Sequence, residues 1–141
     1  MQILIHAKVA QLEKAVLPLL KLLHNHEIHR FNRLQAALYA LKDDFLPDYD
    51  FPSQNCWSAA DNEVRHNIKF LCGKIQCRIQ EISNTSYAVY KLTDEGLDDA
   101  ERYFELLSDQ ERVKLENVAK CLNDHNSGKS LSALVDCLNR V

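Results

Sequence analysis

Tyr90-Lys91-Leu92-Thr93-Asp94-Glu95-Gly96 is the most informative part of the sequence, because it joins the end of an expected strand to the start of an expected helix. Leu92 closes an alternating apolar run that is typical of a β-strand. Thr93 can accept a hydrogen bond from the unpaired amides of a following helix, and Asp94 and Glu95 suit the positive end of its dipole. The stretch therefore predicts a strand that is followed directly by a capped helix.

The residues before this junction predict a β-hairpin. Apolar and polar residues alternate in 74–82, and 87–92 is rich in residue types that favour strands. The polar residues 83–86 are turn formers, so we expect the tip of the hairpin near Asn84. A further short strand is expected at 27–29.

Helices account for most of the remaining sequence. Apolar residues recur at intervals of three and four, and this spacing predicts helices over 8–23, 30–42, 58–72, 96–107, 108–122 and 130–141. Ser108 and Glu111 form a full capping box, whereas Ser58 and Asp61 form one with Asp in the place of Glu. Pro18 should bend the first helix. The expected fold class is α+β and mostly helical.

Composition limits what this chain can be. With 141 residues and 46% hydrophobic content, 1–141 can form a single domain with a true core. Charged residues interrupt the apolar 1–23, so we expect no signal peptide and no membrane segment, and a soluble, cytoplasmic protein. The five cysteines fall mostly where an apolar residue would serve, which indicates reduced core thiols rather than a zinc site. The histidines of 24–29 are expected to end a helix rather than to bind a metal.

Charge is distributed unevenly along the chain. The net charge is −3; residues 92–141 hold six basic and eleven acidic groups, whereas 24–91 hold eight of each and 1–23 hold three basic and one acidic. A basic stripe of the kind that announces nucleic-acid binding is therefore absent at this level of counting.

Three helices followed by a hairpin resemble the order of a winged-helix (winged helix-turn-helix) domain. Phe70-Leu71-Cys72-Gly73-Lys74-Ile75 and Tyr90–Gly96 resemble the end of the third helix and the exit from the wing of PadR-like and MarR-like regulators. Lys74 departs from the apolar residue that is usual after the glycine. The resemblance implies a winged-helix core at 24–95, with helical extensions at 1–23 and 96–141.

A second resemblance covers more of the chain. Leu34-Gln35-Ala36-Ala37-Leu38-Tyr39-Ala40-Leu41 is similar to a helix of phage-associated and antitoxin-type winged-helix proteins. Tyr49-Asp50-Phe51 and Cys56-Trp57-Ser58 fall where that group has an aromatic segment and the entry to the third helix, although the Gly-Pro of that entry is missing. The tail from Leu107 to Leu138 also resembles the helical ending of the group.

The first functional hypothesis is a DNA-binding transcriptional regulator. The third helix would enter the major groove, where cationic and amide side chains read base edges or hold phosphates, and the hairpin would contact the backbone or the minor groove. The candidate DNA-binding residues are Arg30, Arg33, Asn62, Arg65, His66, Lys69, Arg78, Asn84 and Thr85. Against this hypothesis, Asp61 and Glu63 lie on the same helix, and a polar outer face is the ordinary state of any surface helix.

The alternative hypothesis is a protein-interaction module, such as an antitoxin, phage accessory protein or inhibitor. Large apolar side chains in 43–57 are separated by aspartates, and aromatic anchors framed by carboxylates suit a protein interface. The candidate interface residues are Phe45, Tyr49, Phe51, Trp57, Leu134 and Leu138. The same rings could instead fill the gap between the second and third helices.

Catalysis is the weakest interpretation. No phosphate-binding glycine loop, nucleophile elbow or zinc-protease helix occurs in the sequence, so we expect neither an enzyme nor a cofactor. Self-association is expected under either leading hypothesis. The apolar stripes of the first and last helices, which include Leu19, Leu23 and Leu131, predict a two-fold homodimer, unless they pack on each other within one chain.

Overall fold

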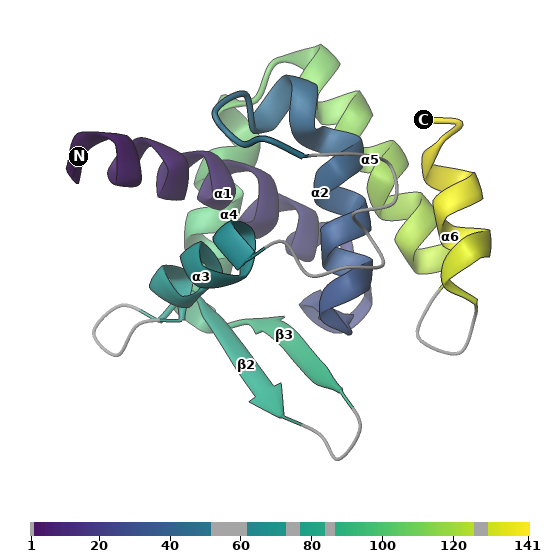
Figure 1. Cartoon of the computed structure of the whole chain (residues 1–141), viewed down its shortest axis with the longest axis horizontal. Helices are drawn as coiled ribbons and strands as arrows, with labels where there is room; N and C mark the ends of the chain where they lie inside the picture. Colours follow the sequence, from purple (N-terminus) through teal and green to yellow (C-terminus); the bar gives the residue numbers. More distant parts are fainter. Residues whose placement is uncertain (1, 52–61, 73–76, 84–86, 126–129) are drawn as a thin grey trace.

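A computed structural model describes residues 2–51, 62–72, 77–83, 87–125 and 130–141 (Figure 1). Within them the chain forms a mostly helical body with a small antiparallel sheet, which confirms the predicted α+β class. The elements are α1 (Gln2–Leu22), a 3-10 turn η1 (His24–His26), β1 (Glu27–His29), α2 (Phe31–Phe45), α3 (Asn62–Leu71), β2 (Ile79–Ser83), β3 (Ala88–Leu92), α4 (Asp94–Leu106), α5 (Asp109–Asp124) and α6 (Leu131–Leu138).

The sheet has three antiparallel strands in the order β1-β3-β2. Ile28 pairs with Tyr90, and Gln80 pairs with Lys91, so β3 is the central strand. The predicted hairpin and the short strand before α2 are both confirmed, although β2 starts later than the alternation suggested. The β2–β3 hairpin projects from the helical body (Figure 1), and its expected tip near Asn84 lies outside the described residues.

The junction after β3 has the predicted cap. The Gly96 amide donates to Thr93 Oγ1 at 3.0 Å, and the Thr93 hydroxyl donates to the Cys77 carbonyl at 2.6 Å. Thr93 therefore caps α4 and ties its start to the residues that lead into β2. A Cβ at Gly96 would lie 1.9 Å from the Arg78 carbonyl oxygen, so only glycine fits this close approach.

Helix α1 is the centre of the core. It starts at Gln2, earlier than the apolar spacing indicated, and it packs against α2, α3, α4 and α5. Its fully buried side chains are Leu12, Ala15, Val16, Leu17, Leu19 and Leu20. Such a helix, apolar over most of its circumference, belongs inside a protein rather than on its surface. None of the described helices is long and apolar enough to span a bilayer.

The last two helices pack on the same chain. The Ser108 and Glu111 capping box starts α5 as predicted, and the Ser130 hydroxyl accepts from the Ala133 amide at the start of α6. Leu19, Leu23, Leu134 and Leu138 are all buried within one chain, and Leu131 packs against them. These stripes are therefore buried against other helices of the same chain, because α1 packs on α2, α3, α4 and α5, and α6 packs on α2 and α5. They no longer argue for a dimer, which stays a prediction without their support.

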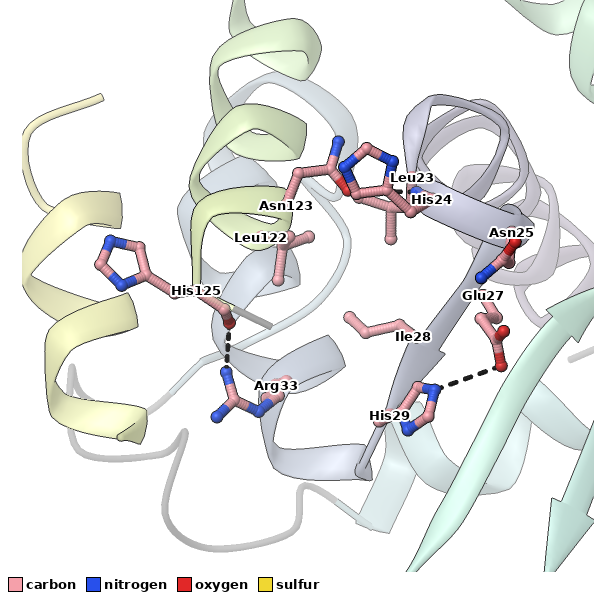
Figure 2. Close-up of a pocket in the computed structure, with 10 residues that line it drawn as sticks. All are labelled: Leu23, His24, Asn25, Glu27, Ile28, His29, Arg33, Leu122, Asn123 and His125. Atoms are coloured by element: carbon pink, nitrogen blue, oxygen red, sulfur yellow. Dashed lines mark hydrogen bonds and ion pairs between the residues drawn. The ribbon is translucent and has the colours of Figure 1, made fainter. Parts of the chain in front are cut away.

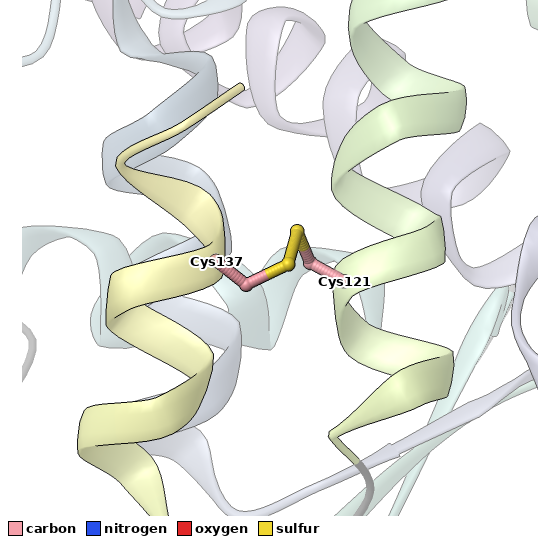
Figure 3. Close-up of a disulfide and its surroundings, with 2 residues drawn as sticks. All are labelled: Cys121 and Cys137. Atoms are coloured by element: carbon pink, nitrogen blue, oxygen red, sulfur yellow. A yellow bond between two sulfur atoms is a disulfide. The ribbon is translucent and has the colours of Figure 1, made fainter.

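A disulfide between Cys121 and Cys137 links α5 to α6, with the two Cα atoms 5.8 Å apart (Figure 3). The prediction of reduced thiols is wrong for this pair, because the packing of α6 on α5 brings the two residues together. Cys72 and Cys77 carry free thiols, and Cys56 lies outside the described residues. Burial, with Glu81 and Cys77 nearby, raises the pKa of the Cys72 thiol to about 11.

Candidate nucleic-acid interface

Helix α3 presents one apolar and one polar face. Val64, Ile68 and Leu71 are buried against the body of the protein, and their spacing of three and four residues leaves the other side in solvent. On that side Arg65, His66 and Lys69 are exposed, as the sequence predicted. The side chain of Asn62 lies outside what the structure describes.

A buried hydrogen-bond chain holds α3 against α1. Asn67 Nδ2 donates to the Tyr49 hydroxyl at 2.9 Å, and this hydroxyl donates to the Lys8 carbonyl at 3.0 Å. Lys8 Nζ also lies 2.8 Å from Glu63 Oε1. The face of α3 is thus fixed relative to α1 by contacts on its inner side and at its first turn.

Aromatic rings support the basic side chains of this region. The Arg65 guanidinium lies 4.2 Å from the centroid of the Phe31 ring, and Phe31 meets Tyr90 of β3 edge-on at 6.2 Å. Arg30, which is also exposed, lies 5.0 Å from the Tyr87 ring. Stacking on a ring restricts a guanidinium without covering its N–H edge, so both arginines remain able to bind an anion or a base.

The charge on the outer face of α3 is positive. Arg65 and Lys69 are the two cations of this helix. Its carboxylate, Glu63, forms an ion pair with Lys8 of α1. Phe70 adds an apolar side chain that is 50% exposed and that meets the His66 ring edge-on at 5.8 Å. The net charge of the whole chain therefore conceals a locally basic helix.

Two of the predicted DNA-binding arginines point into the protein instead. Arg33 is 4% exposed, and its Nη1 donates to the His125 carbonyl at 2.6 Å. Burial, reinforced by the charge of Arg30, lowers the pKa of Arg33. Arg78 Nη1 lies 2.6 Å from Glu13 Oε1, in a contact between the start of β2 and α1. Neither side chain is placed to contact DNA, because each is held by an element of the core.

The described part of the hairpin exposes polar residues other than the predicted contacts. Gln80, Glu81 and Lys91 are exposed on it, together with Ile82, which is 42% exposed. Asn84 and Thr85, the predicted contacts at the tip, lie outside the described residues. On the described strands one exposed carboxylate balances one exposed ammonium, so the positive charge of the region comes from the helices.

The predicted protein-interface residues form part of the core. All those that the structure describes are at most 9% exposed: Phe45, Tyr49, Phe51, Leu134 and Leu138. Phe51 meets Tyr39 of α2 edge-on at 5.9 Å, and Tyr49 forms the link to α3 described above. Trp57 lies outside the described residues. The five side chains are therefore not exposed anchors, and for the three rings the alternative of a place in the core is the one that the structure supports.

We compared the chain with known proteins, and no family model, curated protein sequence or solved structure matches it. Within the described residues, no three His, Cys, Asp or Glu side chains are grouped so that they could hold a metal ion. His26, from the predicted histidine cluster, has its Nδ1 atom 3.0 Å from the Lys21 carbonyl at the end of α1.

Sequence reasoning missed the residues that position α3. Asn67 is a polar residue on the inward side of an amphipathic helix, which was a usable signal for a buried hydrogen bond. Its partner Tyr49 was identified only as an aromatic anchor. The sequence does not indicate that the Phe31 ring stacks on Arg65, because this contact joins α2 to α3 and depends on the tertiary structure.

Proposed function

We propose that this chain is a winged-helix DNA-binding regulator, with α3 as the helix that enters the major groove and the β2–β3 hairpin as the wing. The strand order β1-β3-β2 and the sequence of β1, α2, α3 and hairpin support this arrangement. The polar outer face of α3 supports the choice of recognition helix.

The observation that carries the proposal is the exposure of Arg65, His66 and Lys69 on one face of α3. The opposite face of this helix is held by hydrogen bonds through Asn67 and Tyr49. An α-helix fits the major groove, where a guanidinium can donate two hydrogen bonds to guanine and an ammonium can neutralise a phosphate. The Phe31 ring holds the Arg65 guanidinium, and the chain through Asn67 and Tyr49 holds the helix. Such a preorganised face loses little conformational freedom when it binds.

Burial of the aromatic segment favours DNA over a protein partner. The five described side chains proposed for a protein interface lie in the core, whereas the basic residues of α3 face solvent. Arg30 adds a fourth polar group beside the hairpin.

The test is binding to genomic fragments that include the region upstream of the protein's own coding sequence, measured by fluorescence anisotropy at several salt concentrations. We expect a selected fragment to bind, and Arg65→Ala and Lys69→Ala to weaken binding by about tenfold or more each. Removing a phosphate contact should lower the slope of log affinity against log salt by about 0.9.

Lys120→Ala is the matched control, because Lys120 is an exposed cation on α5, outside the proposed face. It should leave the affinity for the selected fragment unchanged. If no fragment raises its anisotropy on addition of the protein at about 50 mM salt, where nonspecific binding is strong, the proposal is contradicted.

A further inference from the structure

Strand β2 is one edge of the three-stranded sheet, and it lies along the outer side of the hairpin that projects from the helical body (Figure 1). The Arg78 carbonyl, just before this strand, accepts from the Thr93 amide at 3.1 Å. This bond sets the phase of the ladder, because pairs that exchange hydrogen bonds alternate with pairs that do not in an antiparallel sheet. Gln80 and Ile82 therefore direct their backbone N–H and C=O groups toward β3.

The other residues of β2 direct the same backbone groups away from β3. The Ile79 carbonyl has a partner on this side, since the Cys77 thiol donates to it at 2.9 Å. Within the described residues, the N–H and C=O groups of Glu81 and Ser83 have no backbone partner. Such a row of unpaired donors and acceptors is a template for one more strand.

The opposite edge of the sheet, β1, is closed to a further strand. It spans only Glu27–His29, and the residues on either side of it, His26 and Arg30, have positive φ angles of 55° and 75° that bend the chain. Its outer side faces a cavity of about 250 Å³, which the carboxyl-terminal ends of α1 and α5 and the first turn of α2 also line (Figure 2). Short strands and covering elements are common protections of a sheet edge.

Strand β2 lacks these protections. It pairs with β3 over Ile79–Ser83 without a bulge, and it contains no proline, glycine or lysine. Its one charged residue is Glu81. Ile82 is 42% exposed, and an apolar side chain on a neighbouring strand would cover it further. The edge therefore combines free hydrogen-bonding groups with an exposed apolar residue.

A second copy of the chain offers a strand that matches this edge. When two β2 strands pair antiparallel with Ile82 opposite Ile82, the free groups of Glu81 meet those of Ser83 of the second copy. This register brings the two isoleucines into contact and sets each carboxylate opposite a residue without charge. The next register toward the body with the same hydrogen-bond phase sets Glu81 opposite Glu81, where like charges destabilise the pair.

The shape of the molecule allows this pairing. Ile82 lies toward the far end of β2, whereas the helical body lies at the other end of the hairpin (Figure 1). Two antiparallel β2 strands therefore hold the two bodies at opposite ends of the joined sheet. Ile79, at the end of β2 nearest the body, is fully buried, so the paired part of the edge is the outer part.

We propose that the outer edge of β2 is a homodimer interface, at which two copies join their sheets into one antiparallel sheet with its two-fold axis at Ile82. This interface lies outside the predicted apolar stripes and does not use the proposed DNA contacts on α3. It buries less than the roughly 1,000 Å² that a stable complex needs, so we expect a dissociation constant of about 100 μM.

The test uses the full chain without DNA and compares amide chemical shifts and hydrogen exchange by NMR at about 10 μM and about 1 mM. We expect the amides of Glu81 and Ser83 to shift with concentration and to exchange about fourfold more slowly at the higher concentration. The amides of Gln80 and Ile82 should change much less, because they already donate to β3.

The register has its own readout in a mixture of carbon-13-labelled and unlabelled protein. Ile82 and Ile82 of the second copy form a pair that does not exchange hydrogen bonds, and the Hα atoms of such a pair face each other at close range. We expect an intermolecular nuclear Overhauser effect between these two Hα atoms. Glu81→Gln should change the dissociation constant by no more than about twofold, because Glu81 does not face Glu81 in this register.

Ile82→Lys sets like charges opposite each other and should weaken association by at least about tenfold. Val113→Lys is the matched control, because Val113 is a β-branched residue on α5 that is 56% exposed, and it should leave association unchanged. Ser83→Pro is the second variant. It removes a donor that points away from β3, so the β2–β3 ladder remains while association weakens by at least about tenfold.

Unchanged signals of the Glu81 and Ser83 amides up to about 1 mM would overturn the interface, and so would equal effects of Ile82→Lys and Val113→Lys. Association that is at least about tenfold tighter in Glu81→Gln would overturn the register. If the two amides shift only when a peptide of alternating threonine and valine is added, the edge takes a foreign strand and self-pairing is wrong. None of these results depends on whether the protein binds DNA.

Discussion

The outer face of α3 and the cavity beside β1 use arginine in opposite ways. On α3, Arg65 lies over the Phe31 ring with its surroundings open to solvent. At the cavity, Arg33 is 4% exposed and donates to the end of α5. The face comes from a single ten-residue helix, whereas the cavity needs the ends of α1 and α5, β1 and the start of α2. Exposed residues on a single helix can therefore be replaced with little loss of stability. Buried residues that contact several elements contribute to the free energy of unfolding, so replacing them also destabilises the fold.

The sharpest test of this contrast compares Arg33→Ala with Arg65→Ala. Arg33→Ala should lower the free energy of unfolding by about 3 kcal/mol, because it leaves a void and removes the donor from the buried His125 carbonyl. Arg65→Ala loses one stacking contact at an exposed position and should cost about 1 kcal/mol or less. Urea unfolding of both variants measures the difference, and equal losses would show that the two arginines do not differ in this way.

Tyr49→Phe tests whether the position of α3 depends on its buried hydrogen bonds. The substitution leaves Asn67 Nδ2 and the Lys8 carbonyl without the hydroxyl that joins them, so we expect a loss of about 1 to 2 kcal/mol. Hydrogen exchange should speed up at the α3 amides more than at those of α5. Tyr87→Phe is the matched control, because its hydroxyl makes only a long contact of 3.4 Å with His29 Nδ1 at a partly exposed position, and it should change both quantities much less. Unchanged exchange in α3 would show that the chain through Tyr49 does not position the helix.

The smallest expected effect concerns the contact between α1 and α5, which form two walls of the cavity. Burial opposes ionisation of Glu111, but Lys14 at 2.8 Å and the Ser108 amide outweigh it and lower the pKa of Glu111. Because the folded-state pKa lies below the unfolded value, the ionised carboxylate stabilises the fold above about pH 4.3, and this contribution is lost as the pH falls through the folded value.

Glu111→Gln should therefore cost about 0.5 to 1 kcal/mol at pH 7, a small amount because Lys14 is partly exposed to solvent. The difference from the unaltered chain should shrink between about pH 5 and pH 3. Urea midpoints across this range measure it, with Glu116→Gln, at an exposed position on the same helix, as the control. A difference that persists at pH 3 would exclude the ionised carboxylate as its source.

Local patterns predicted much of the fold because their causes lie within a few residues. Thr93 caps the amide three residues later, and Ser108 with Glu111 closes a capping box over the same interval. Alternation found the hairpin, and helical spacing placed Arg65, His66 and Lys69 on the outer side of α3. Each of these depends on the geometry of one turn of helix or one pair of strands.

The errors share a different cause. Arg33 and Arg78 were predicted to contact DNA because a guanidinium suits phosphates and base edges, but the carboxyl-terminal end of α5 and Glu13 of α1 hold them inside. Cys121 and Cys137 both occupy apolar helix positions, which suits a thiol and a disulfide equally well. The partner that decides each of these cases is 16 or more positions away along the chain, and local spacing carries no information about it.

By itself the sequence determined the strand-to-helix junction at 90–96, the class of the fold and the polar side of α3. Hydrogen bonds over three or four residues and the alternation of side chains are enough to specify these features. The tertiary structure alone places the aromatic residues at 45–51 in the core, brings Arg33 to the end of α5 and forms the cavity beside β1. Burial, charge pairing and cavity shape depend on which distant segments meet, and packing around α1 settles that.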